Sequence, residues 1–156
     1  MAHMLPEREG DEEIRMYVED VRIGQLLPPL ERTLTLPMLV AYAGATWDWH
    51  RYHYDQGFSQ TIGHPAPFVD GQLFGGLLAK LVLDWAGPDA MLRKLRLRYR
   101  AVIYTGERVT CHGRVAGLEE RDGRSLVVCE LRVETGDGRV VVDSACAEVE
   151  LPHAPG

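Results

Sequence analysis

The sequence predicts an α+β fold in which a curved antiparallel sheet wraps around one long, buried helix. Residues 71–86 are apolar on nearly all sides, which is typical of a helix inside a core. The segments after this helix read as strands and are separated by Asp-Gly turns, as in antiparallel hairpins. With 156 residues, the chain has the length of one domain with a sizeable core.

The elements before the long helix are short. We expect a strand at 17–21 and another at 30–36, where leucines alternate imperfectly with polar residues. Pro37 then opens a helix over 37–45, because the first helical turn tolerates proline. A second short helix is expected at 55–60.

The long helix has a clear start and two unusual glycines. Asp70 is a plausible N-cap, since its side chain can accept a hydrogen bond from the first turn. Gly75 and Gly76 lie inside the helix, where each costs about 1 kcal/mol relative to alanine. Their presence predicts that something packs close to the backbone there.

Four strands are expected after the helix. The first begins with strict alternation between charged and apolar residues from Lys94 to Arg100. The strands cover 94–104, 107–120, 125–135 and 140–152, with hairpin turns at 121–124 and 136–139. We expect all four to pair in chain order as an antiparallel meander.

Composition excludes several classes of protein. The formal net charge of −6 argues against nonspecific nucleic-acid binding. No apolar run reaches the roughly 18 residues of a membrane span, and no apolar core of a signal peptide is visible. The three cysteines favour free thiols in a reducing cytoplasm over disulfides or a zinc site. We expect a cloning remnant and flexible terminus at 1–13, one domain at 14–152 and a tail at 153–156.

The stretch "WDWHRYHYD", residues 47–55, concentrates costly side chains on one predicted loop. Its two histidines, with Asp48 and Asp55 beside them, are the residue types of a metal site, but no further ligand is obviously placed. Asp48 and His53, five residues apart, could face one pocket and move two protons through a water molecule. A solvated, aromatic-rich surface loop is the third possibility, and composition alone leaves all three open.

The same stretch, "TWDWHRYHYD", resembles the signature loop of the MaoC-like (R)-specific enoyl-CoA hydratase/dehydratase family, roughly Gly-Asp-x-Asn-Pro-x-His. "FVDGQLFGGLLAKLVLDW" resembles the central helix of that family's hotdog fold, and "LRLRYRAVIYTGERVTCHGRV" resembles its first long strands. The resemblance covers about residues 29–152. Trp47, His50 and Arg51 depart from the family's usual Gly, Asn and Pro.

The resemblance implies a hotdog fold and an enoyl-CoA hydratase or 3-hydroxyacyl-CoA dehydratase of lipid metabolism, without a cofactor or a metal. It places the catalytic residues at Asp48 and His53 and the oxyanion-hole donor at the Gly71 N–H. His50, Trp47 and Asp70 are candidate substrate-binding residues, and Asp70 is also the expected helix cap. A hotdog thioesterase and a non-catalytic acyl-binding or partner subunit are the alternative functions.

The implied partners are an acyl-CoA thioester and a second hotdog chain, with neither nucleic acid nor a membrane. The family pairs two hotdogs, as a homodimer or as a heteromer. "DWAGP", residues 84–88, adds a weaker likeness to small subunits of heteromeric steroid side-chain hydratases. Apolar runs at 126–128 and 140–142 exceed what one helix can cover, so we expect them to form the interface of a homodimer.

Overall fold

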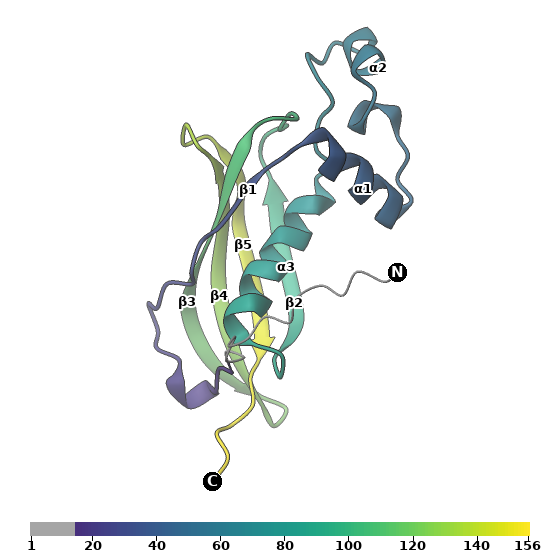
Figure 1. Cartoon of the computed structure of the whole chain (residues 1–156). Helices are drawn as coiled ribbons and strands as arrows, with labels where there is room; N and C mark the ends of the chain where they lie inside the picture. Colours follow the sequence, from purple (N-terminus) through teal and green to yellow (C-terminus); the bar gives the residue numbers. More distant parts are fainter. Residues whose placement is uncertain (1–14) are drawn as a thin grey trace, which may run out of the picture.

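The structure is a computed structural model that describes residues 15–156. The predicted cloning remnant and flexible terminus at 1–13 lie outside the described residues. The elements, in chain order, are η1 (Val18–Asp20), β1 (Leu30–Thr33), α1 (Leu36–Thr46), η2 (Arg51–His53), α2 (Gln56–Thr61), α3 (Gln72–Ala86), β2 (Met91–Tyr99), β3 (Arg108–Arg121), β4 (Arg124–Thr135) and β5 (Val140–Glu150). Figure 1 shows the sheet curved along α3, which is the α+β hotdog architecture that the sequence predicts.

The five strands form one antiparallel sheet in the order β1-β3-β4-β5-β2. The hairpin predicted at 121–124 is confirmed, and both Asp122 and Gly123 adopt the positive φ that its tight turn requires. The expected four-strand meander is wrong in one place, because β2 pairs with β5 and not with β3. Residues 100–107 carry the chain to the opposite side of the sheet, and the tight turn at Thr105-Gly106 lies within this longer connection, where the Glu107 N–H donates to the Tyr104 carbonyl.

The strand expected at 17–21 is also wrong. This segment forms the single 3-10 turn η1, in which the Asp20 N–H donates to the Tyr17 carbonyl. The Val18 N–H donates to the Pro152 carbonyl near the end of the chain. These bonds use the backbone groups that a strand would need for a ladder.

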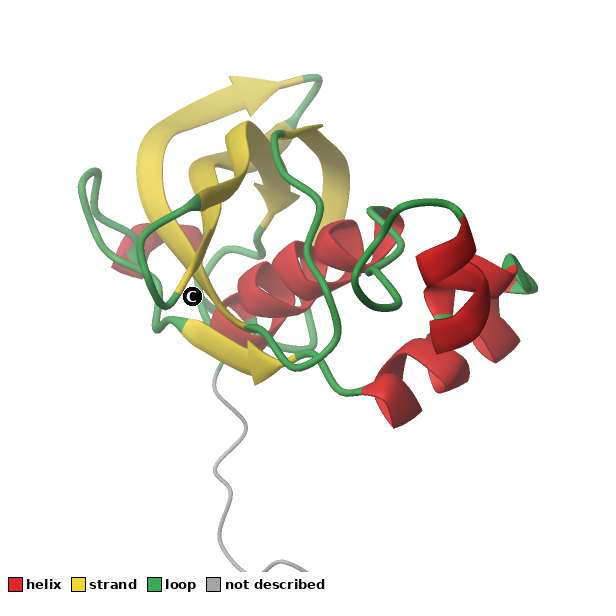
Figure 2. Ribbon diagram, turned by 90° about the horizontal axis from the view of Figure 1, so that it is seen from above, coloured by secondary structure: helices red, strands yellow, loops and turns green. Residues whose placement is uncertain are grey.

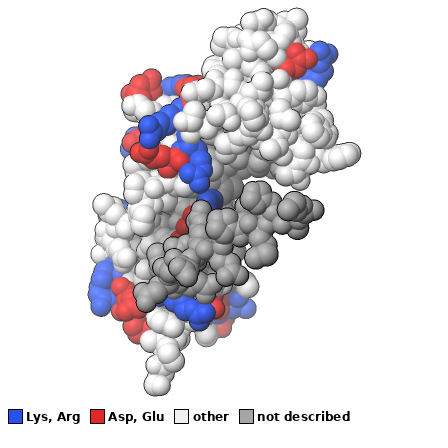
Figure 3. Space-filling model, viewed as in Figure 1, with Lys and Arg blue, Asp and Glu red and all other residues white. Residues whose placement is uncertain are grey.

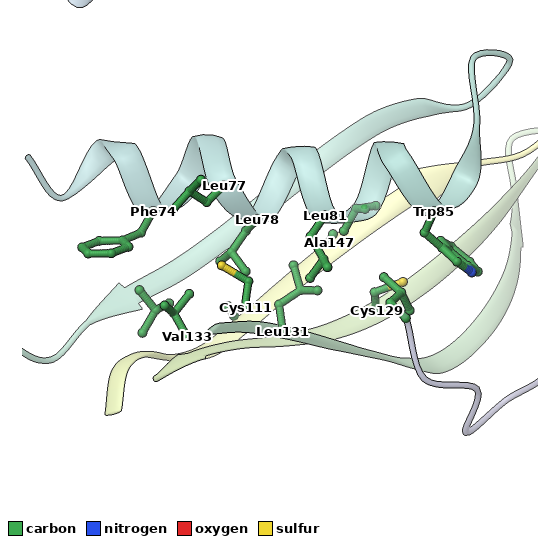
Figure 4. Packing of buried hydrophobic residues seen from close by; sticks show 14 of the residues in the cluster. Phe74, Leu77, Leu78, Leu81, Trp85, Cys111, Cys129, Leu131, Val133 and Ala147 are labelled. Atoms are coloured by element: carbon green, nitrogen blue, oxygen red, sulfur yellow. The ribbon is translucent and has the colours of Figure 1, made fainter. Parts of the chain in front are cut away.

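The core lies between α3 and the inner face of the sheet, as Figure 2 shows from above and Figure 4 shows in detail. Phe74, Leu78 and Leu81 of α3 meet Val133 and Ala147 of the sheet in this layer. Within residues 15–156, the helix is not covered on all sides as expected, since the curved sheet reaches only one of its faces. Gly76, Lys80 and Leu83 face outward, and Leu83 is 36% exposed.

The apolar runs at 126–128 and 140–142 do not form the exposed interface patch that the sequence predicts. Leu126, Val127, Val141 and Val142 are all at most 4% exposed, because the core of this single chain buries them. Only Val128 and Val140 of the two runs are half-buried, so an interface on this chain would need mainly other apolar surface.

Two further expectations concern the cysteines and the membrane. Cys111 and Cys129 are free and buried, and burial raises the pKa of each thiol to about 12. Cys146 is free and half-buried. Within residues 15–156, no helix combines the length and the apolar character needed to cross a membrane.

Candidate active site

The loop between α1 and α2 carries most of the candidate residues. Thr35 caps α1 by accepting a hydrogen bond from the Met38 N–H, and α1 ends at Trp47, whose φ of 62° reverses the chain direction. Asp55 caps α2 by accepting from the Phe58 N–H, and its carboxylate pairs with Arg51 at 2.7 Å. The backbone bond from Phe58 and the Arg51 guanidinium lower the pKa of Asp55. Asp55 therefore has a structural role and does not join the histidines in a metal site.

His53 is the most buried of the candidate side chains, at 6% exposure. Its Nδ1 lies 2.7 Å from the Phe68 carbonyl oxygen. Because a carbonyl only accepts, Nδ1 carries the proton that it donates, and a neutral ring then has its lone pair on Nε2. The rings of Tyr52 and Phe68 pack edgewise against the imidazole, with centroids 4.4 and 5.3 Å away. These contacts fix both the orientation of the ring and its tautomer.

Asp48 and Asp70 face the free nitrogen of His53. The Asp48 Oδ2 lies 4.0 Å from His53 Nε2, and the Asp48 Oδ1 accepts the His50 N–H at 3.3 Å. Asp70 Oδ1 accepts the Gln72 N–H at 2.9 Å, whereas its Oδ2 is buried and has no hydrogen-bond partner among residues 15–156. One ligand atom from each of Asp48, His53 and Asp70 lies within 4.8 Å of the others.

A small cavity of about 10 Å³ lies between these groups, lined also by Leu39, Tyr42, Ala43 and Leu73. This is close to the smallest volume that holds one water molecule. The 4.0 Å gap between Asp48 and His53 is too long for a direct hydrogen bond and has the length that a bridging water fills. The arrangement can thus hold one water between a base and a carboxylate.

Gly71 lies between Asp70, whose side chain caps the helix, and Gln72, the first residue of α3. Within the described part of the chain, no acceptor bonds to its N–H, which sits at the positive end of the helix dipole. The ring of Tyr99 packs against Gly71 so closely that an added Cβ would lie 3.3 Å from its Cζ. Glycine at this position therefore keeps room for Tyr99 and leaves a backbone donor near the acid/base pair.

Three tyrosines around the carboxylates were not predicted as a group. Burial first, and then the charge of Asp70, raises the pKa of Tyr42 and of Tyr99, while burial and the charges of Asp48 and Asp70 raise that of Tyr52. The hydroxyls therefore remain protonated donors at neutral pH. Tyr42 lies three residues after Leu39 on α1, so both side chains lie on the same face of that helix. This spacing is the sequence signal that could have placed Tyr42 at the cavity.

His50 and Trp47 lie apart from the cavity. The His50 ring is exposed and stacks on Tyr52 with centroids 4.8 Å apart. Trp47 is 81% exposed and meets Trp49 edge to face. Only the backbone of His50, through its bond to Asp48, reaches the acid/base pair. Figure 3 shows that the lobe above the sheet, which holds α1 and α2, carries few charged groups on this face.

The acid/base cavity is not the largest hollow in the molecule. A cavity of about 610 Å³ lies on the sheet beside Arg114, Glu130 and Cys146, and another of about 450 Å³ lies beside the C-terminal end of α3. Neither contains Asp48, His53 or Asp70. The small cavity is the candidate site, because general acid/base catalysis needs converging ionisable groups and Asp48, His53 and Asp70 converge there.

Known proteins resemble this chain in sequence and in fold. A 3-oxo-4,17-pregnadiene-20-carboxyl-CoA hydratase beta subunit from Mycobacterium tuberculosis is 31% identical over 98 residues, which is 63% of this chain and 76% of that protein. An (R)-specific enoyl-CoA hydratase from Rhodospirillum rubrum is 28% identical over 110 residues, 70% of this chain and 76% of that protein. A chain of the crystal structure of the ChsH1-ChsH2 complex from M. tuberculosis superposes with a TM-score of 0.74 at 27% identity, covering 83% of this chain and 98% of that one.

The family model described as "MaoC like domain" matches residues 21–137, which include the loop, α3 and most of the sheet. This match spans more than half of the chain. The protein therefore belongs to the MaoC-like domain family.

Proposed function

We propose that this chain adds water reversibly to a 2-enoyl-CoA thioester and so forms a 3-hydroxyacyl-CoA. The observation that carries the proposal is the buried His53, whose one free ring nitrogen faces Asp48 across a gap of 4.0 Å. The relatives named as CoA hydratases support the same reaction class.

In this mechanism, a water molecule between the two side chains gives one proton to His53 Nε2, and its oxygen bonds to the β-carbon. Asp48 accepts a hydrogen bond from the other O–H, whose hydrogen stays on the oxygen as the product hydroxyl, and it stabilises the imidazolium that forms. The imidazolium then gives its proton to the α-carbon, so that one water has been added across the double bond and His53 is neutral again. Such positioned proton transfers contribute about 10²- to 10⁴-fold to a rate.

The thioester oxygen gains negative charge during the addition and needs fixed donors. We assign this role to the Gly71 N–H, because it has no acceptor among residues 15–156 and sits at the N-terminus of α3. Asp70 caps α3 with one oxygen and presents the other to the cavity, where we propose that it contacts the bound water. Trp47 and His50 would bind substrate only if the CoA portion runs over the exposed loop surface.

The test is an assay of crotonyl, long-chain and steroid enoyl-CoA thioesters with two readouts. We expect the ultraviolet absorbance of the conjugated enoyl thioester to fall without release of free CoA thiol. Thiol release in step with consumption would show the alternative thioesterase activity, in which water attacks the carbonyl. No turnover on the whole panel would favour a non-catalytic partner subunit.

Metal removal gives an independent prediction. Asp48, His53 and Asp70 could together ligate a divalent ion, so the proposed metal-free mechanism needs its own check. We expect full hydratase activity after dialysis against EDTA. Activity that is lost on chelation and restored by one metal ion would replace the proposed acid/base roles with a metal-bound water.

We further propose that two copies pair through the free edge of β2. This nine-residue edge strand has no neighbour on one side in the described chain, and long free edges invite pairing. Beside it, the bare face of α3 exposes Leu83 and the Gly76 backbone, and an added Cβ at Gly76 would meet nothing within 4 Å. The heteromeric ChsH1-ChsH2 structure supports pairing with a second, different chain as the other form of this assembly. We also propose that the protein acts in the reducing cytoplasm, where free thiols such as these persist.

A further inference from the structure

The three side chains around the acid/base cavity also have the spacing of a metal site. One ligand atom from each of Asp48, His53 and Asp70 lies within 4.8 Å of the other two, and all three residues line the cavity of about 10 Å³. Zinc binds histidine nitrogen and aspartate oxygen at about 2.0–2.2 Å, so each atom would need to move inward by less than about 1 Å. Two carboxylates beside a neutral imidazole also balance the charge of a divalent cation.

His53 already makes the second contact that metal-binding histidines use. Its side chain is buried, and its Nδ1–H donates to the Phe68 carbonyl oxygen at 2.7 Å. Its Nε2 faces the Asp48 Oδ2 at 4.0 Å. Histidine ligands almost always donate their other ring N–H to a carbonyl, a carboxylate or water, and this bond fixes the tautomer that presents a lone pair to the metal. The contact with Phe68 is independent of the carboxylate spacing and points to the same ligand.

The two carboxylates are anchored in a similar way. Asp48 Oδ1 accepts the His50 N–H at 3.3 Å, and Asp70 Oδ1 accepts the Gln72 N–H at 2.9 Å. Each can therefore offer its other oxygen to an ion and keep its bond to the backbone. Asp48 and His53 belong to the segment between α1 and α2, whereas Asp70 precedes α3, so a bound ion would join two segments of the chain. Ion binding should therefore stabilise the folded protein.

The size of the cavity and the types of ligand select the ion. Calcium takes about six to eight oxygen ligands, and magnesium usually keeps several waters in an octahedral shell. A cavity with room for about one water molecule suits neither of them. One imidazole nitrogen and two carboxylate oxygens, with a fourth position open to water, are a ligand set that zinc accepts.

We propose that a zinc ion binds reversibly to Asp48, His53 and Asp70, in the place assigned to the water, and so inhibits hydration. The inhibition rests on the proposed function, because His53 Nε2 must accept a proton from water in that mechanism and a nitrogen that holds zinc cannot do so. The binding itself does not depend on the reaction. Zinc is an inhibitor in this account, which agrees with full activity after dialysis against EDTA.

The experiment is a calorimetric titration of the full chain with zinc chloride, after EDTA treatment and desalting. We expect saturable binding of one ion per chain, and magnesium chloride should show none. Asp70→Asn keeps the acceptor for the Gln72 N–H but loses a carboxylate, so it should weaken zinc binding at least about tenfold, since even a lost outer-shell contact costs about 10- to 100-fold. His112→Gln removes the exposed histidine that lies 3.3 Å from Glu134 and should leave the binding unchanged. Excess zinc should raise the Tm of the wild type and of His112→Gln more than that of Asp70→Asn.

The enoyl-CoA assay gives the second readout. One zinc ion per chain should abolish turnover of the wild type, and EDTA should restore it. No saturable binding to the wild type, or equal affinity in the wild type and folded Asp70→Asn, would overturn the proposed site. Zinc binding that leaves turnover unchanged would overturn the inhibition. A wild type without turnover on any substrate would refute the proposed function, whereas calorimetry would still decide whether these three side chains bind zinc.

Discussion

Each of three side chains, those of His53, Asp48 and Asp70, bonds to the backbone through one polar atom and turns a second polar atom towards the cavity. His53 donates through Nδ1 to the Phe68 carbonyl, Asp48 accepts the His50 N–H, and Asp70 accepts the Gln72 N–H. The second atom of each side chain is left facing the others. Catalytic groups held in this way need little reorganisation when water and substrate arrive, since local backbone bonds already fix their orientation.

Asp70 allows its two roles to be separated by substitution. Asp70→Asn keeps an acceptor for the Gln72 N–H, and asparagine caps helices about as well as aspartate, so urea unfolding should change little. Asp70→Ala removes the cap and should lower the free energy of unfolding by about 1 kcal/mol. Both variants lose the carboxylate that faces the cavity, and we expect turnover to fall about tenfold or more in each. Normal turnover in Asp70→Asn would reduce Asp70 to a helix cap.

At the scale of elements, α3 and β2 together set the shape of the site and leave one side open. The N-terminus of α3 presents Gly71, and Tyr99 at the end of β2 packs on it. Along the open side of this pair, Leu83 is exposed, and Leu92, Leu95 and Leu97 pack against the core from the edge strand but are only half-buried. This is the apolar strip that a second chain would cover, and the runs at 126–128 and 140–142 are not part of it.

The assembly prediction compares a substitution at Leu83 with the same substitution at Ile62, an exposed residue of similar size. Light scattering of the wild type should give about twice the 17.5 kDa chain mass at micromolar concentration. Leu83→Asp should shift the protein towards the monomer mass, because it places a charge in the proposed interface. Ile62→Asp, at an exposed position that follows α2, should leave the mass unchanged. A wild type that is monomeric and active would contradict the pairing through β2.

Local sequence signals predicted the elements better than their arrangement. The long helix was predicted within one residue at its start, and the Asp-Gly turn at 121–124 was predicted from two adjacent residues. The pairing of β2 with β5 depends on contacts far apart in the chain, so no turn signal revealed it. Tyr42 and Tyr99 approach Asp70 from two different elements, which alternation along the sequence does not encode.

For the whole molecule, the size of the acid/base cavity is the decisive property. About 10 Å³ holds a water but no acyl group, so in the proposed reaction the enoyl substrate would lie on the surface that this chain leaves open. Pairing through β2 would enclose that surface, because Tyr99 of β2 packs against Gly71 beside the acid/base pair. In the proposed mechanism, Asp48 and His53 come from one chain, and we expect the second chain to complete the acyl site.

The most direct test of the acid/base pair is the turnover of purified, folded Asp48→Asn and His53→Ala with the best enoyl-CoA substrate. Each variant should lose at least about 100-fold in turnover, the usual scale for a missing acid/base group. Circular dichroism and light scattering should match the wild type, which separates lost chemistry from lost structure. Near-normal turnover in either folded variant would contradict the assignment of the reaction to Asp48 and His53.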